Sequence, residues 1–128
     1  MRLGTQLLDT RFTPEWLDAH PADRRLAEML VARRRAEKSA DARRGEAEQL
    51  AARSHHDVND RLARVTCPTL VASGRFDGIA PAANGEAIAR RIRGAGLRIY
   101  EGGHAFFAQD PAALPDILTL LRGGEISA

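Results

Sequence analysis

The chain has 128 residues, and its 19 Lys and Arg residues nearly balance its 17 Asp and Glu residues, giving a formal net charge of +2 at pH 7. This size and composition are typical of one soluble globular domain. The single cysteine, Cys67, excludes an internal disulfide. The first 30 residues contain no apolar run longer than Leu7–Leu8, so we expect neither a signal peptide nor a membrane-spanning segment, and we expect a cytoplasmic location.

The basic residues do not indicate a nucleic-acid partner. Arginine clusters such as residues 33–35 and 43–44 alternate with acidic residues along the same segments. Proteins that bind phosphate backbones concentrate positive charge on one face, whereas alternating charges are typical of a solvated helix with internal ion pairs. We therefore expect no nucleic acid and no membrane among the partners.

The first half of the sequence predicts helices. Thr13 followed by Pro14 is a typical helix start, and Pro21 ends this first helix at about residue 20. Longer helices are predicted at about residues 22–38 and 41–53, with a short helical stretch at 57–63. Their apolar residues are too few for an independent helix bundle.

The second half predicts alternating strands and helices. The apolar run at residues 69–72 is typical of a strand covered on both faces, and a helix follows from Pro81 to about Gly94. The alternating pattern at 97–101 indicates a second, more exposed strand, and a final helix is predicted from Asp110 to about residue 122. This βαβα order favours two adjacent parallel strands joined by a crossover helix, with ligand chemistry at the carboxyl ends of the strands.

Two polar residues follow the two predicted strands. Asp77 lies in the loop after the first strand and His104 in the loop after the second, and glycines flank both. Adjacent parallel strands are about 4.8 Å apart, so side chains just beyond their ends can form a hydrogen bond. A carboxylate that fixes the tautomer of an imidazole base is a common catalytic arrangement. The sequence therefore predicts that Asp77 and His104 form a catalytic pair.

Other candidate sites are weaker. The run His55-His56-Asp57 offers possible metal ligands, but adjacent histidines point apart and no further ligand cluster supports them. We expect no metal and no cofactor. Phe106 and Phe107 are predicted to pack in the core and hold the His104 loop.

The sequence resembles the C-terminal part of the α/β-hydrolase family. The resemblance rests on Cys-Pro-Thr-Leu-Val at 67–71, Gly-x-x-Asp-x-x-x-Pro at 74–81 and Gly-Gly-His-x-Phe-Phe at 102–107, followed by an amphipathic helix. It implies an α/β fold in which residues 57–128 form the C-terminal βαβα part of the core. Residues 1–56 would be the remnant of a helical cap, with Phe12 and Trp16 as candidate pocket-lining residues.

In related enol-lactonases and esterases, the aspartate that matches Asp77 orients the histidine that matches His104. That histidine activates a serine in a Gly-x-Ser-x-Gly turn, which comes earlier in the chain. The 128 residues contain no such motif. Their serines are Ser39, Ser54, Ser73 and Ser127. Ser73 is expected to have a packing or turn role, and Cys67, which precedes the first strand, is expected to be a small buried apolar residue.

The resemblance thus implies hydrolysis of carboxylic esters or lactones by a serine mechanism whose nucleophile comes from an N-terminal half. The chain alone is expected to be inactive. The alternative is a non-catalytic interaction or assembly module that uses the same partial fold, for example through self-association at the open sheet edge.

Overall fold

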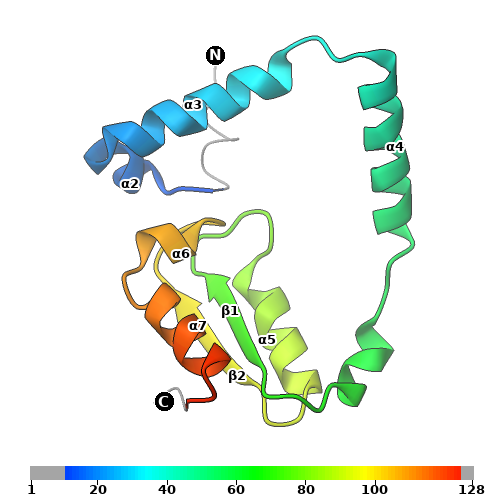
Figure 1. Cartoon of the computed structure of the whole chain (residues 1–128), viewed down its shortest axis with the longest axis vertical. Coiled ribbons are helices and arrows are strands. Elements are labelled where there is room, and N and C mark those ends of the chain that lie inside the picture. The colour runs from blue at the N-terminus through cyan, green and yellow to red at the C-terminus, as the bar shows by residue number, and fades with distance from the viewer. Residues whose placement is uncertain (1–10, 125–128) are drawn as a thin grey trace.

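The computed structural model describes residues 11–124. Its first half is helical, as predicted (Figure 1). The helices are α2 (Pro14–Ala19), α3 (Pro21–Arg35), α4 (Ala40–Ser54) and the 3-10 helix η1 (Asn59–Arg64). The predicted helix start is confirmed, because the Trp16 amide donates to Thr13 Oγ1 at 3.3 Å.

The second half contains a small parallel sheet, also as predicted. Its elements are β1 (Leu70–Gly74), α5 (Ala82–Arg91), β2 (Gly96–Tyr100), α6 (Phe106–Gln109) and α7 (Ala113–Leu121). The two strands run in parallel, with Leu70 opposite Gly96 and Gly74 opposite Tyr100. Helix α6 lies where the sequence predicted a loop. It is followed by its C-cap residue Asp110, whose carboxylate accepts hydrogen bonds from the amides of Glu101 and Ala112.

Helices cover the sheet on both faces. Helix α5 packs against both strands, and α7 contacts β1 from the other side (Figure 1). No residue of β1 is exposed, and its last two residues are buried. In β2 the first two residues are exposed and only the last is buried. The predicted difference in exposure between the two strands is therefore confirmed.

The N-terminal helices have a small core of their own. Phe12, Leu17 and Ala27 are buried together, and Trp16 and Ala105 pack against them. Since Ala105 follows His104 in the chain, this core lies against the carboxyl end of the sheet. Phe12 is therefore a core residue of the N-terminal part, and its role as a pocket-lining residue stays a prediction.

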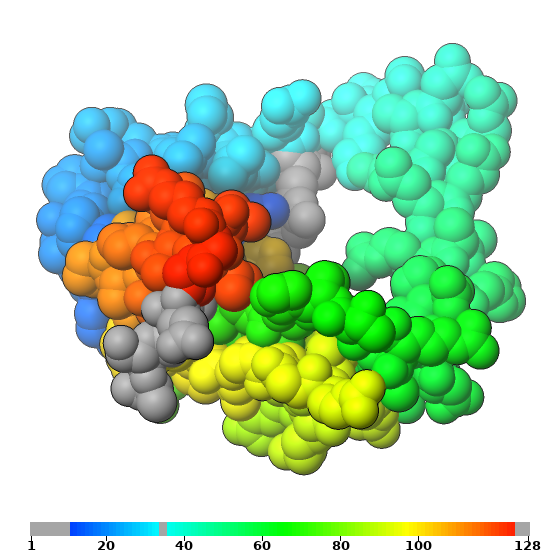
Figure 2. All heavy atoms as spheres, turned by 60° about the horizontal axis from the view of Figure 1, so that its bottom comes forward, coloured from blue at the N-terminus to red at the C-terminus, as the bar shows by residue number. Residues whose placement is uncertain are grey.

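Helix α4 contrasts with the rest of the chain. None of its residues is buried, and its mixture of charged residues and alanines presents no continuous apolar face. In Figures 1 and 2 it stands clear of the α/β part, at the right of both views. No helix within residues 11–124 is long and apolar enough to cross a bilayer.

Two expectations about burial are wrong. Cys67 is exposed, and it lies in the segment between η1 and β1, outside every helix and strand. Phe107 is 49% exposed. Phe106 behaves as predicted, since it is half-buried and stacks on Tyr100 with a centroid distance of 5.4 Å.

Candidate active site

The loops that follow β1 and β2 lie in close contact. The Arg75 amide donates to Tyr100 O at 2.8 Å and the Phe76 amide to Gly102 O at 2.9 Å, so the pairing of the strands continues into the loops. A Cβ atom on Gly74 would lie 2.2 Å from Gly103 O. Only glycine at position 74 allows this approach, which brings the side chains of the two loops together.

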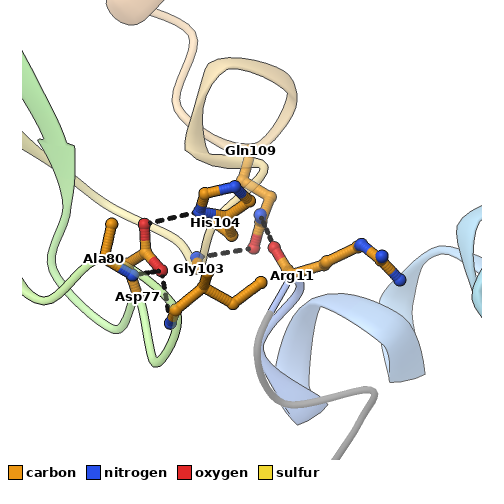
Figure 3. A network of polar contacts seen from close by, with 7 residues as sticks. Arg11, Asp77, Ala80, Gly103, His104 and Gln109 are labelled. Atoms are coloured by element: carbon orange, nitrogen blue, oxygen red, sulfur yellow. Dashed lines mark hydrogen bonds and ion pairs between the residues drawn. The ribbon is translucent and has the colours of Figure 1, made fainter. Parts of the chain in front are cut away.

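Asp77 and His104 meet at this point (Figure 3). The distance between His104 Nδ1 and Asp77 Oδ2 is 2.9 Å. The second carboxylate oxygen, Oδ1, accepts from the amides of Ile79 at 2.8 Å and Ala80 at 2.9 Å. Because the turn after Asp77 holds one oxygen and the imidazole holds the other, the carboxylate has a single orientation.

The protonation of Asp77 follows from these contacts. Burial raises the pKa of Asp77, but the hydrogen bonds from the Ala80 amide, the His104 ring and the Ile79 amide outweigh it and lower the pKa below its ordinary value of 3.8. Asp77 is therefore a carboxylate at neutral pH and accepts a hydrogen bond from the Nδ1–H group of His104.

The imidazole of His104 is accessible on its other side. Its side chain is 45% exposed, whereas that of Asp77 is 4% exposed. Within residues 11–124, His104 Nε2 makes no hydrogen bond. With Nδ1–H directed at Asp77, Nε2 carries the lone pair that can take a proton from a nucleophile.

The serines of the described chain are engaged elsewhere. Ser73 faces α5, since a Cβ on Gly85 would lie 2.4 Å from Ser73 Oγ, and this agrees with the expected packing role. Ser39 caps α4, and the Ser54 hydroxyl donates to Ala51 O at 2.7 Å. Ser127 lies outside the described residues. No serine hydroxyl or cysteine thiol of residues 11–124 contacts His104.

The remaining sequence candidates do not join this site. Among the described residues, no group of three or more His, Cys, Asp and Glu side chains is arranged to hold a metal ion. Trp16, a candidate pocket-lining residue, borders an open hollow of about 300 Å³ between α2 and the loops after the strands. That hollow also includes Phe76, Gly102 and Gln109.

Gln109 is a site neighbour that the sequence analysis missed. Its side chain is buried and links the loop of His104 to residues 11–13 (Figure 3). A single glutamine in a predicted loop carries no motif, and two of its partners, Thr13 and Arg11, lie almost the whole chain away. Only the folded structure shows this contact.

Comparison with known proteins identifies a similar fold. No protein-family model matches the chain, and no curated protein matches it. Among solved structures, the chain is similar to Est816, described as an N-acyl homoserine lactone degrading enzyme, with a TM-score of 0.63 and 23% sequence identity. The match covers 94% of this chain and 45% of Est816, so the chain spans less than half the length of that enzyme. At this identity the likeness shows the fold alone: this chain has a partial α/β fold of the kind found in that enzyme.

Proposed function

We propose that the chain is the C-terminal part of an α/β-hydrolase, and that Asp77 and His104 are the acid and the base of its catalytic triad. The observation that carries the proposal is the hydrogen bond between a buried carboxylate and an accessible imidazole at the carboxyl ends of two adjacent parallel strands. The fold of a lactone-degrading enzyme supports it. In this proposal residues 1–56 are the remnant of a helical cap and residues 57–128 belong to the hydrolase core.

The proposed reaction is the hydrolysis of a carboxylic ester or lactone. Asp77 holds His104 so that Nε2 takes the proton from a serine hydroxyl of an N-terminal half. The serine oxygen attacks the carbonyl carbon, and His104 returns the proton to the leaving alkoxide as the ester C–O bond breaks. Water then attacks the acyl-serine, again giving its proton to Nε2, and His104 returns this proton to the serine oxygen as the acyl–oxygen bond breaks and the acid is released.

The test is complementation by an N-terminal fragment. The 128 residues alone are expected to show no ester or lactone hydrolysis above background, since they contain no Gly-x-Ser-x-Gly motif. Addition of an N-terminal fragment of a related hydrolase that carries the Gly-x-Ser-x-Gly motif is expected to produce activity toward a chromogenic ester and an N-acyl homoserine lactone.

Variants of the complemented protein identify the residues responsible. His104→Ala is expected to abolish the activity, and Asp77→Asn to lower it about 10⁴-fold, because the wrong imidazole tautomer is then favoured. His56→Ala is the matched control, since His56 is exposed beyond the end of α4. Hydrolysis by the chain alone that His104→Ala leaves unchanged would refute the proposal.

A second candidate function is an assembly module. Within residues 11–124, β1 pairs only with β2, so one edge of β1 has no strand partner. Leu114, Leu118 and Leu121 of the neighbouring helix α7 are exposed. An unpaired edge beside apolar residues favours association with another chain. Sedimentation at micromolar concentration distinguishes the two candidate functions. If the chain forms a stable assembly, and this assembly does not change when the N-terminal fragment is added, the assembly module is favoured.

A further inference from the structure

The side chain of Gln109 joins two segments that are far apart in the sequence. It is 8% exposed, and both ends of its amide have partners. Oε1 accepts from the Thr13 amide at 3.3 Å. It also accepts from the Gly103 amide at 3.4 Å, while Nε2 donates to Arg11 O at 2.9 Å (Figure 3). A buried amide with donor and acceptor both satisfied is typical of a residue that fixes its neighbours in place.

The network surrounds His104 on both sides in the chain. The residue before it, Gly103, donates its amide to Gln109, and the residue after it, Ala105, donates its amide to Arg11 O at 2.9 Å. Arg11 O therefore accepts from both Ala105 and Gln109. The backbone on either side of the imidazole is held by one connected set of hydrogen bonds.

Glycines make the network close-packed. A Cβ on Gly103 would lie 2.7 Å from Arg11 O, and a Cβ on Gly102 would lie 2.9 Å from Gln109 Cβ. Gly102 also has a φ of +123°, a conformation that other residues rarely adopt. The loop of His104 therefore has little room to move while Gln109 and Arg11 remain in place.

We infer that Gln109 is a positioning residue that holds the His104 ring against Asp77 and makes this geometry depend on the docking of residues 11–13. The inference rests on the proposed function only in naming His104 as the base. The helical N-terminal part thereby controls the site through the backbone: when residues 11–13 leave, the bond that holds Ala105 is lost, and Gln109, which holds Gly103, loses its two other partners.

The chemistry of the side chain explains why glutamine fits here. Methionine has a similar length and shape but can form none of the three hydrogen bonds. Glutamate keeps an acceptor for the Thr13 and Gly103 amides, but its carboxylate has no proton to donate to Arg11 O. Gln109→Met therefore removes all three bonds of this side chain, and Gln109→Glu removes its bond to Arg11 O.

The experiment is nuclear magnetic resonance of the 128-residue chain with the variant Gln109→Met. In the wild type we expect one imidazole tautomer, with the proton on Nδ1 of His104, and slow exchange of the Gly103 and Ala105 amide hydrogens. In Gln109→Met we expect a mixture of tautomers and exchange of these two amides at least ~10-fold faster. If Gln109→Met does not fold, Gln109→Glu is measured in its place, with the same change expected at Ala105.

Tyr100→Phe is the matched control. It removes another buried hydrogen bond of the same region, the one from Tyr100 Oη to Asp116 at 2.9 Å, without touching Gln109. We expect it to lower global stability and to leave the tautomer of His104 unchanged. Wild-type tautomer and exchange in the Gln109 variant would overturn the inference, as would equal effects of Tyr100→Phe. The tautomer and the exchange rates are measured without any activity. If the N-terminal fragment binds but no hydrolysis follows, the proposed function is refuted and the inference about Gln109 is not.

Discussion

The contact between Gly74 and the His104 loop offers a direct test of how the site is held together. The substitution Gly74→Ala adds one methyl group, which would lie 2.2 Å from Gly103 O and 2.9 Å from Gly102 O. Both atoms belong to backbone, so no side chain can rotate away. Ordinary contact begins at 3.4 Å, and the two loops must therefore separate by about 1 Å.

The expected cost follows from that displacement. Overpacking of a buried site costs about 1–3 kcal/mol. A separation of about 1 Å also takes the 2.9 Å contact between Asp77 and His104 beyond hydrogen-bond range, at about 1 kcal/mol for the lost bond. The lower backbone entropy of unfolded alanine returns about 0.4–1 kcal/mol. We expect Gly74→Ala to lower the free energy of unfolding by about 1–4 kcal/mol.

Gly96→Ala is the control for this measurement. Gly96 begins β2 in the same sheet. The atom nearest to a Cβ added at Gly96 would be Leu70 Cδ1 at 3.8 Å, which is an ordinary van der Waals contact. Urea unfolding of both variants measures the effect, with the slope of the transition expected to stay constant. If Gly74→Ala is as stable as Gly96→Ala, the close approach of the loops is not present in solution and the account of the site fails.

Three further predictions concern titration and exposure. The lowered pKa of Asp77 gives the folded state a stability that is complete above the ordinary value of 3.8 and is lost as pH falls through the lowered pKa. Asp77→Asn is therefore expected to flatten the acid side of the stability profile measured by urea unfolding. Burial, together with the hydrogen bond to Asp116 and its charge, raises the pKa of Tyr100 to about 12. As Tyr100 is the only tyrosine, tyrosinate absorbance is expected to titrate near that value in the folded protein and near 10.0 after unfolding, whereas a folded midpoint near 10.0 would contradict its burial. The exposed thiol of Cys67 is expected to react with a thiol reagent about as fast in the folded as in the unfolded chain, and a reaction limited by unfolding would show that it is covered.

The sequence was informative where structure depends on neighbours along the chain. Thr13 and Pro14 marked a helix start, and the apolar run before Gly74 marked a strand, because capping and periodicity are local properties. The βαβα order was enough to place Asp77 and His104 at the same end of one sheet. Their hydrogen bond follows from that topology, whereas their catalytic role stays a prediction.

The sequence was uninformative where structure depends on distant segments. Cys67 has an apolar side chain, but burial needs an element that covers it, and residue type does not show whether one is present. Gln109 forms hydrogen bonds with Thr13 and Arg11, which are 96 and 98 positions away in the sequence. Hydrophobic periodicity does not extend over such a separation. Both cases concern tertiary contacts of single residues, which a local pattern cannot specify.

The contact between Gln109 and Arg11 also sets an order of events during synthesis of the chain. Asp77 and His104 are separated by 27 positions, but Arg11 and Gln109 are separated by 98, so closing the longer loop costs about 1 kcal/mol more in chain entropy. Contacts of high sequence separation form late in folding. At a synthesis rate of about 5–20 residues per second, Arg11 waits roughly 5–20 s for its partner to be made. The segment made early is thus among the last to dock, after β1, α5 and β2 have brought Asp77 and His104 together.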